Sequence, residues 1–297
     1  MKLEDYLVST KPDYRNPFPP GKLILFVGDE KTGKTTAAST FSPKGADGVV
    51  ILDLEAGARC DKNITMLIHG LYPMEDEKGN IIPPEKRGFR DSSGNIQPAY
   101  SIYEALAILK QTWKDSGKTT LVIDTFDKLA EWVNEDTLAQ MKAEDAELDN
   151  PKWQTVQTIE EIPYAQGIAR ARNTSLRIKD RLLDIIKDTG LLICNLHTQK
   201  TMRVENGRDI IVKKLPMIHE KLATTLGHQA ELICMFTVYA SGNYLFDVRG
   251  FGEVTLGTRI EPLNGKIFKW NKTHPTLYEV LTKECLKYAE KLEGKEK

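Results

Sequence analysis

The sequence predicts an α/β protein in which helices flank a mostly parallel sheet. Short apolar, β-branched runs alternate with longer amphipathic stretches, the pattern of strands joined by crossover helices. The runs are almost entirely apolar, as strands covered on both faces should be. With 297 residues, the chain is long enough to form one large core.

Four apolar runs predict the parallel strands: "LILFV" (23–27), "GVVILDL" (48–54), "TTLVID" (119–124) and "GLLICNL" (190–196). Two amphipathic stretches between them predict crossover helices. The first, 101–117, opens at a Ser cap and stops at Gly117, and the second, 177–190, closes at Gly190. Glycine is favoured just after a helix because it adopts the left-handed conformation without strain.

Beyond residue 200 the pattern predicts antiparallel strands that extend the sheet edge. "MRVENGRDIIV" contains an Asn-Gly hairpin turn, and "AELICMFTVYASGNYLFDVRG" predicts two strands around an "SGN" turn. Residues 276–292 predict a closing amphipathic helix whose inward residues are Leu277, Val280, Leu281, Cys285, Tyr288 and Leu292.

We expect one main domain. Residues 1–21 form an N-terminal extension, 22–260 form the core, and 261–297 add a strand and helix to the same domain. The stretch at about 74–98 interrupts the alternation with glycine, proline and charge, and the stretch at about 131–165 is polar and helix-compatible before it becomes less regular, so both are predicted to be exposed insertions.

Composition narrows the function classes. Lys and Arg total 41 against 42 Asp and Glu, so any site for a polyanion must be a local patch. The N-terminus has no signal-peptide core and no apolar run could span a bilayer, which predicts a cytoplasmic protein without a membrane partner. The cysteines are far apart and predict structural thiols in a reducing compartment; they are Cys60, Cys194, Cys234 and Cys285.

A phosphate-binding loop follows the first predicted strand. Gly28, Gly33, Lys34 and Thr35 complete the pattern GxxxxGK[ST] between a strand and a helix. Lys34 is predicted to reach the β and γ phosphates, and Thr35 to ligate Mg²⁺. The alternative is a plain strand-to-helix turn with an exposed lysine. The predicted nucleotide-binding residues are Gly28, Asp29, Glu30, Lys31, Thr32, Gly33, Lys34, Thr35 and Thr36.

Two carboxylates follow neighbouring strands. Asp124 ends "LVID", where a carboxylate can hold the magnesium shell. Glu55 lies just beyond "VVILDL", where it could deprotonate the attacking water. The alternatives are a helix cap for Asp124 and a solvated loop charge for Glu55.

The series "GDEKTGKT", "ILDLEAG", "LVIDT" and "LLICNLHTQK" resembles RecA-like P-loop ATPases over residues 22–260, particularly compact phage-encoded nucleotide-binding or single-strand-annealing ATPases. The resemblance implies ATP and Mg²⁺ as cofactors and Glu55 as catalytic base. It implies a γ-phosphate sensor at His197 or, second, Gln199. It also implies an arginine acting across a subunit interface, for which Arg259 is favoured over Arg249.

The same resemblance implies single-stranded DNA contacts in 131–165 and 200–214, and assembly into a homo-oligomeric ring or filament. The second segment carries basic residues suited to tracking a phosphate backbone. Edge lysines that keep a hairpin soluble are the alternative. A single-strand-binding protein is a further candidate partner. The candidate DNA-binding residues are Lys200, Arg203, Arg208, Lys213 and Lys214.

The sequence therefore predicts an ATPase that binds or anneals single-stranded DNA in phage recombination or replication. A nucleotide-gated interaction protein with weak turnover, such as a helicase loader or a packaging or defence switch, is the alternative. A small-molecule kinase shares the phosphate loop, but the sequence has no lid-like arginine cluster. No base-reading element is identifiable, so ATP, dATP and GTP all remain candidates.

Overall fold

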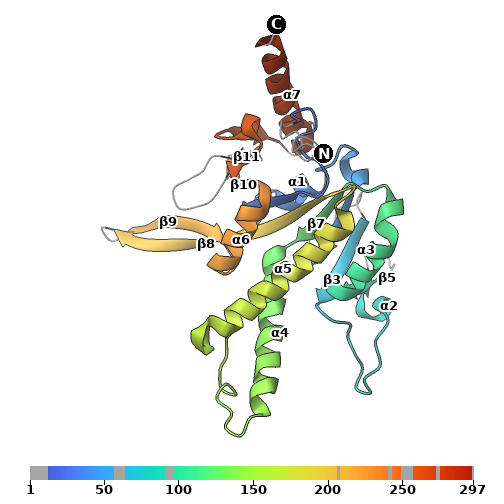
Figure 1. The fold of residues 1–297 in the computed structure, drawn as a ribbon, viewed down its shortest axis with the longest axis vertical. Coiled ribbons are helices and arrows are strands. Elements are labelled where there is room, and N and C mark those ends of the chain that lie inside the picture. The colour runs from blue at the N-terminus through green and yellow to red at the C-terminus, as the bar shows by residue number, and fades with distance from the viewer. Residues whose placement is uncertain are drawn as a thin grey trace, which may run out of the picture.

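A computed structural model describes residues 13–56, 64–90, 96–205, 208–239, 243–248, 257–271 and 275–295. Within these ranges only the backbone is described for residues 64, 89–90, 200–205, 208–215, 239 and 295. Figure 1 shows a central sheet with helices on its faces and three extensions: the β8–β9 hairpin, the α4–α5 pair and α7.

The main sheet has the strand order β13-β11-β10-β1-β8-β7-β2-β3-β6, with β12 paired to β10 and β9 paired to β8. The strands of this sheet are β1 Leu23–Gly28, β2 Val49–Asp53, β3 Ile64–Gly70, β6 Ala99–Ser101, β7 Thr120–Asp124, β8 Leu191–Glu205, β9 Arg208–Pro216, β10 Ala230–Tyr239, β11 Asn243–Asp247, β12 Gly257–Thr258 and β13 Ile267–Trp270. A separate small ribbon joins β4 Phe89–Arg90 and β5 Ile96–Gln97.

The predicted α/β class is confirmed: helices flank a mostly parallel sheet, and antiparallel strands from the C-terminal part extend it. From β10 to β6 every neighbouring pair is parallel. Strand β8 separates β1 from β7, so the strand before the phosphate loop and the strand ending at Asp124 are not direct neighbours. One expectation needs correction: β10 pairs with β1 in parallel, and only β11, β12 and β13 extend this edge antiparallel.

The helices are α1 Lys34–Ala38, α2 Pro84–Arg87, α3 Ile102–Ser116, α4 Phe126–Ala146, α5 Gln166–Ile186, α6 Glu220–Gln229 and α7 Leu277–Lys295. The predicted limits of α3 are confirmed. Ser101 and Glu104 exchange a capping box, and Gly117 adopts a left-handed φ of 67°. Helix α5 begins eleven residues before the stretch expected from residue 177, so residues 166–176 are helical as well.

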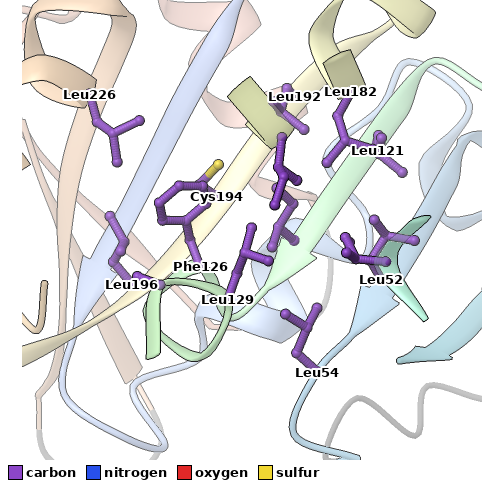
Figure 2. Packing of buried hydrophobic residues seen from close by; sticks show 14 of the residues in the cluster. Leu52, Leu54, Leu121, Phe126, Leu129, Leu182, Leu192, Cys194, Leu196 and Leu226 are labelled. Carbon is purple, nitrogen blue, oxygen red and sulfur yellow. The ribbon is translucent and has the colours of Figure 1, made fainter. Parts of the chain in front are cut away.

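Two apolar clusters cover the two faces of the sheet. Alternation along β1 sends Leu23, Leu25 and Val27 into one cluster, and Ile24 and Phe26 into the other. The first cluster contains residues of α3, α4, α5 and α6; Figure 2 shows its Phe126 and Leu129 packed near Cys194. The second contains residues of α1, the C-terminal strands and α7. Burial of both sheet faces explains the nearly continuous apolar strands.

The C-terminal helix is only partly as predicted. Leu277, Leu281 and Cys285 are fully buried, but Leu292 is 41% exposed. Figure 1 shows that α7 continues past the central sheet, which agrees with the exposure of Leu292 near its end.

The described cysteines Cys194, Cys234 and Cys285 are buried free thiols, and burial raises the pKa of Cys194 and Cys285 to about 12. Cys60 lies outside the described residues. Among the described helices, none has the length and apolar character needed to cross a membrane.

Candidate nucleotide site

The residues predicted to hold the phosphates and the metal lie at the carboxyl ends of β1, β2, β7 and β8. Together they line an open pocket of about 1490 Å³, larger than the roughly 300–1,000 Å³ of typical small-ligand sites. Its walls include loop residues 29–36, the segment 53–56 and the first turn of α4. His197 and Thr198, in the middle of β8, complete the lining. Ligands bind at this edge of open parallel sheets.

Two glycines give the phosphate loop its shape. A Cβ atom at Gly28 would lie 2.7 Å from the Phe236 carbonyl oxygen and 2.8 Å from Thr32 Oγ1, so no larger residue fits there. Gly33 has a φ of 91°, in the region that favours glycine. The Thr32 hydroxyl donates to the Asp29 carbonyl at 2.7 Å and closes the loop on itself.

Lys34 is buried rather than extended into solvent. Its side chain folds along the loop, and Nζ donates to the carbonyls of Gly28 at 2.9 Å and Asp29 at 2.8 Å. Burial lowers the pKa of Lys34, while the nearby carboxylates of Asp124, Asp127 and Glu55 oppose that shift. The ammonium therefore sits among acceptors that an anionic phosphate could replace.

Thr35 and Asp124 meet across the sheet edge. The Thr35 hydroxyl donates to Asp124 Oδ2 at 2.8 Å, and the Asn195 amide donates to Asp124 Oδ1 at 2.8 Å. Burial raises the pKa of the Asp124 carboxyl, and the two hydrogen bonds oppose this. A hydroxyl and a carboxylate are the hard oxygen donors that Mg²⁺ prefers, so this pair fits the predicted ion.

Glu55 follows β2 and lies at the pocket rim. Its Oε1 accepts a hydrogen bond from Thr125 Oγ1 at 2.9 Å, and its backbone N–H donates to Asp53 Oδ1 at 3.2 Å. The side chain is 40% exposed, so Glu55 is held in place yet accessible to water.

His197 is clamped by a residue that the sequence analysis missed. Asp127, in the first turn of α4, accepts hydrogen bonds from the His197 backbone N–H at 3.0 Å and from Nδ1 at 2.9 Å. This hydrogen bond to Asp127 raises the pKa of His197. The next residue, Thr198, donates from its hydroxyl to the Asp29 carboxylate. Strand β8 is thus tied to both α4 and the phosphate loop.

Glu55, Asp127 and His197 also offer three potential metal ligands. One oxygen from each carboxylate and Nδ1 of the histidine all lie within 4.8 Å of one another. Nδ1 is 3.7 Å from Glu55 Oε1 and closer, 2.9 Å, to Asp127 Oδ2. Since an ionised carboxylate can only accept, Nδ1 donates a proton to Asp127, and a metal would have to displace that proton.

The sequence analysis also did not identify three other polar residues of the site, which are Asn195, Thr125 and Thr198. Asn195 orients Asp124, Thr125 orients Glu55, and Thr198 contacts the loop. Asp127 could have been identified from the sequence, because it follows Asp124 by about one helical turn and Asp124 ends a predicted strand. The partners of Asn195 and Thr198 depend on which strands are neighbours, which the local sequence pattern does not contain.

Of the remaining candidates, Gln199 and Arg259 lie outside the pocket lining. Gln199 is exposed and pairs with Leu215 in the hairpin. Arg259 is next to β12, where its guanidinium donates to the His228 carbonyl, so within this chain it is engaged away from the phosphate loop. Arg249 lies outside the described residues.

The basic segment forms the predicted hairpin, in which Lys200 pairs with Lys214 and Thr201 with Lys213. The side chains of its five candidate residues are not among those described. Figure 1 shows the hairpin extending away from the body of the molecule as a continuation of β8. The hairpin is therefore continuous along the backbone with the strand that carries His197 and Thr198.

No family model and no curated protein matches the sequence. Among solved structures, a KaiC-like protein from the hyperthermophilic archaeon Pyrococcus horikoshii is similar. The two chains are 14% identical, the match covers 85% of each, and the TM-score is 0.39. A functional proposal must therefore come from the residues of this chain.

Proposed function

We propose that the protein binds a nucleoside triphosphate, ATP in the first instance, and hydrolyses it with Mg²⁺. The observation that carries this proposal is the convergence of Lys34, the Thr35–Asp124 pair and Glu55 on one pocket. These residues come from three separate stretches of sequence. Their meeting at one edge of the sheet favours a phosphate site over a plain glycine turn.

Each residue has a distinct role. The loop N–H groups and the Lys34 ammonium bind phosphate oxygens. Lys34 would then give up its hydrogen bonds to the Gly28 and Asp29 carbonyls and donate to negatively charged phosphate oxygens instead. Thr35 and Asp124 would hold Mg²⁺, which supplies charge neutralisation at the β and γ phosphates. Asn195 keeps the Asp124 carboxylate oriented toward Thr35.

Glu55 is the residue placed to accept a proton from the attacking water. Its anchored but accessible carboxylate has the position that general-base catalysis requires. His197, with Nδ1 committed to Asp127, presents Nε2 as its remaining polar atom. A protonated imidazole there would donate to a γ-phosphate oxygen and so distinguish triphosphate from diphosphate.

The nucleotide proposal is tested by Lys34→Ala, with Lys291→Ala as control because Lys291 is an exposed lysine of α7 outside the pocket lining. Binding of ATP, dATP and GTP analogues to the folded proteins would be measured by calorimetry with Mg²⁺ present. We expect Lys34→Ala to lose binding and Lys291→Ala to retain it. Equal binding by both variants would contradict the proposal.

We further propose that the β8–β9 hairpin binds single-stranded DNA and that the protein acts in phage recombination or replication, working as an oligomer. Support comes from continuity: the fifteen residues of β8 include His197 and Thr198 in the pocket and Lys200 and Arg203 in the hairpin. A shift at His197 would be transmitted along one strand, as a two-state switch requires. A single-strand-binding protein remains a candidate partner.

Reciprocal linkage tests the DNA role. ATP should tighten DNA binding and DNA should tighten ATP binding by one common factor, typically about 5- to 150-fold. Replacing Arg203 and Lys213 with Ala should weaken DNA binding and lower its salt slope by roughly 0.7 for each phosphate that the variant no longer binds.

The readout is a titration of labelled single-stranded DNA at several salt concentrations, with and without a non-hydrolysable ATP analogue. If parent and hairpin variants bind DNA with one affinity and one salt slope, the DNA role fails. A nucleotide-gated interaction protein with weak turnover would then be the better account, even with nucleotide binding intact.

A further inference from the structure

A second groove lies between α3 and α5 and shares no lining residue with the nucleotide pocket. Its volume is about 1160 Å³. The floor is apolar: Leu106 and Trp113 are buried, and Leu176 and Ile185 are partly buried. The groove could therefore accept apolar side chains between the two helices.

The rim of this groove is positively charged. Two aspartates are present but already paired, Asp180 with Lys179 at 2.5 Å and Asp184 with Lys187 at 2.7 Å. Four exposed cations line the groove and make no ion pair within 4.0 Å with any residue that the structure describes; they are Lys110 and Lys114 on α3, and Arg177 and Arg181 on α5.

The spacing of these cations indicates a binding surface. Lys110 and Lys114 are four residues apart on α3, as are Arg177 and Arg181 on α5, so each pair occupies one helix face. Like charges at this spacing destabilise a helix. Both helices thus present like charges to the groove that an acidic ligand would help to neutralise.

We propose that the α3–α5 groove binds an acidic segment of a partner protein, with apolar side chains of that segment entering between the helices. Charge complementarity selects the acidic residues, and the partly buried Leu176 and Ile185 of the floor select the apolar ones. Nucleic acid fits less well, because phosphates would leave that floor unfilled. Trp113 is only 3% exposed, and its Nε1 donates to Thr189 Oγ1 at 2.9 Å, so it offers no open face for base stacking.

The probe is a fluorescein-labelled synthetic peptide of alternating acidic residues (Asp, Glu) and apolar residues (Leu, Phe). Two matched peptides replace either the apolar residues with Ser or the acidic residues with Lys. Binding to the full-length protein is followed by fluorescence anisotropy at low and high salt. We expect the acidic–apolar peptide to bind most tightly, and to bind less tightly as salt rises.

Charge-reversal variants locate the site. Arg177→Glu combined with Arg181→Glu should weaken peptide binding by about tenfold or more, because attraction becomes repulsion. The matched control is Lys283→Glu combined with Lys291→Glu, two exposed lysines of α7, which packs on the other apolar cluster. That control should bind like the parent.

A steric variant tests the apolar part. Ala107 is exposed and lines the groove, so Ala107→Tyr should fill it without disturbing the core, and Thr112→Tyr on the same helix is the control. Circular dichroism and thermal unfolding confirm that each variant is folded. Equal binding of the Ser peptide, or equal binding by Ala107→Tyr and Thr112→Tyr, would overturn the proposal. So would a DNA oligonucleotide that displaces the peptide and depends equally on Arg177 and Arg181.

Discussion

Asp127 binds His197 twice, accepting hydrogen bonds from its backbone N–H at 3.0 Å and from Nδ1 at 2.9 Å. This double contact joins the first turn of α4 to β8 at the rim of the nucleotide pocket. It fixes the tautomer of His197 and also raises its pKa. The charge and orientation of the predicted γ-phosphate sensor therefore depend on one carboxylate.

Removing that carboxylate should change the titration of His197. In Asp127→Asn the amide cannot stabilise the imidazolium as a carboxylate does, so we expect the pKa of His197 to fall. Histidine NMR spectra recorded against pH give this value, with His197→Gln identifying the resonance among the five histidines. Glu135→Gln, at an exposed carboxylate of α4, should leave it unchanged. An unaltered pKa in Asp127→Asn would show that the contact does not control the ring.

The same contact predicts a pH-dependent stability. Because the pKa of His197 is raised in the folded protein, its contribution is complete below the unfolded value of about 6.5 and is lost as pH rises through the folded pKa. Asp127→Asn should therefore cost about 1–3 kcal/mol near pH 6 and less at pH 9. Urea unfolding at the two pH values measures this. A cost that is constant, or larger at pH 9, would contradict the assignment.

Asn195→Ala tests how Asp124 is held. The variant leaves Asp124 Oδ1 without its amide donor in a buried position, so we expect a loss of about 1–3 kcal/mol at neutral pH. Since burial already raises the pKa of Asp124, the loss should shrink as pH falls and the carboxyl is protonated. Urea unfolding measures both effects, and Asn173→Ala is an exposed control. Stability equal to the parent at pH 7 would show that the Asn195 contact is dispensable.

Much of the fold could be predicted because local patterns encode it. Strands β1, β2 and β7 and residues 191–196 of β8 are buried on both faces and therefore appear as continuous apolar runs. The ends of α3 follow from Ser101 and Gly117. Strand β6, with only three residues, gives no periodic signal. The parallel pairing of β10 with β1 could not be predicted either, because packing across the sheet, rather than the sequence of either strand, decides which strands are neighbours.

The candidate site likewise has one part that the local sequence encodes and another that depends on the order of the strands. The phosphate loop is contiguous in sequence, so its residues were identified together. Thr35, Asp124 and Asn195 form one hydrogen-bonded group only because β8 lies beside β7. A loop lysine is expected to be exposed, yet Lys34 is buried, since its side chain bonds to the carbonyls of its own loop.

The central claim, that this pocket hydrolyses nucleoside triphosphate through Glu55, is tested most directly by Glu55→Gln. The amide keeps an oxygen that can accept from Thr125 but cannot accept a proton from water. ATP hydrolysis with Mg²⁺ and with chelator would be measured with and without single-stranded DNA, beside calorimetric ATP affinity. The control is Glu135→Gln, at an exposed carboxylate of α4 outside the pocket lining. We predict unchanged affinity, turnover reduced about 10²- to 10⁴-fold in Glu55→Gln, and near-parental turnover in the control. Parental turnover by Glu55→Gln, or a parent protein that binds ATP without hydrolysing it under any of these conditions, would contradict the account.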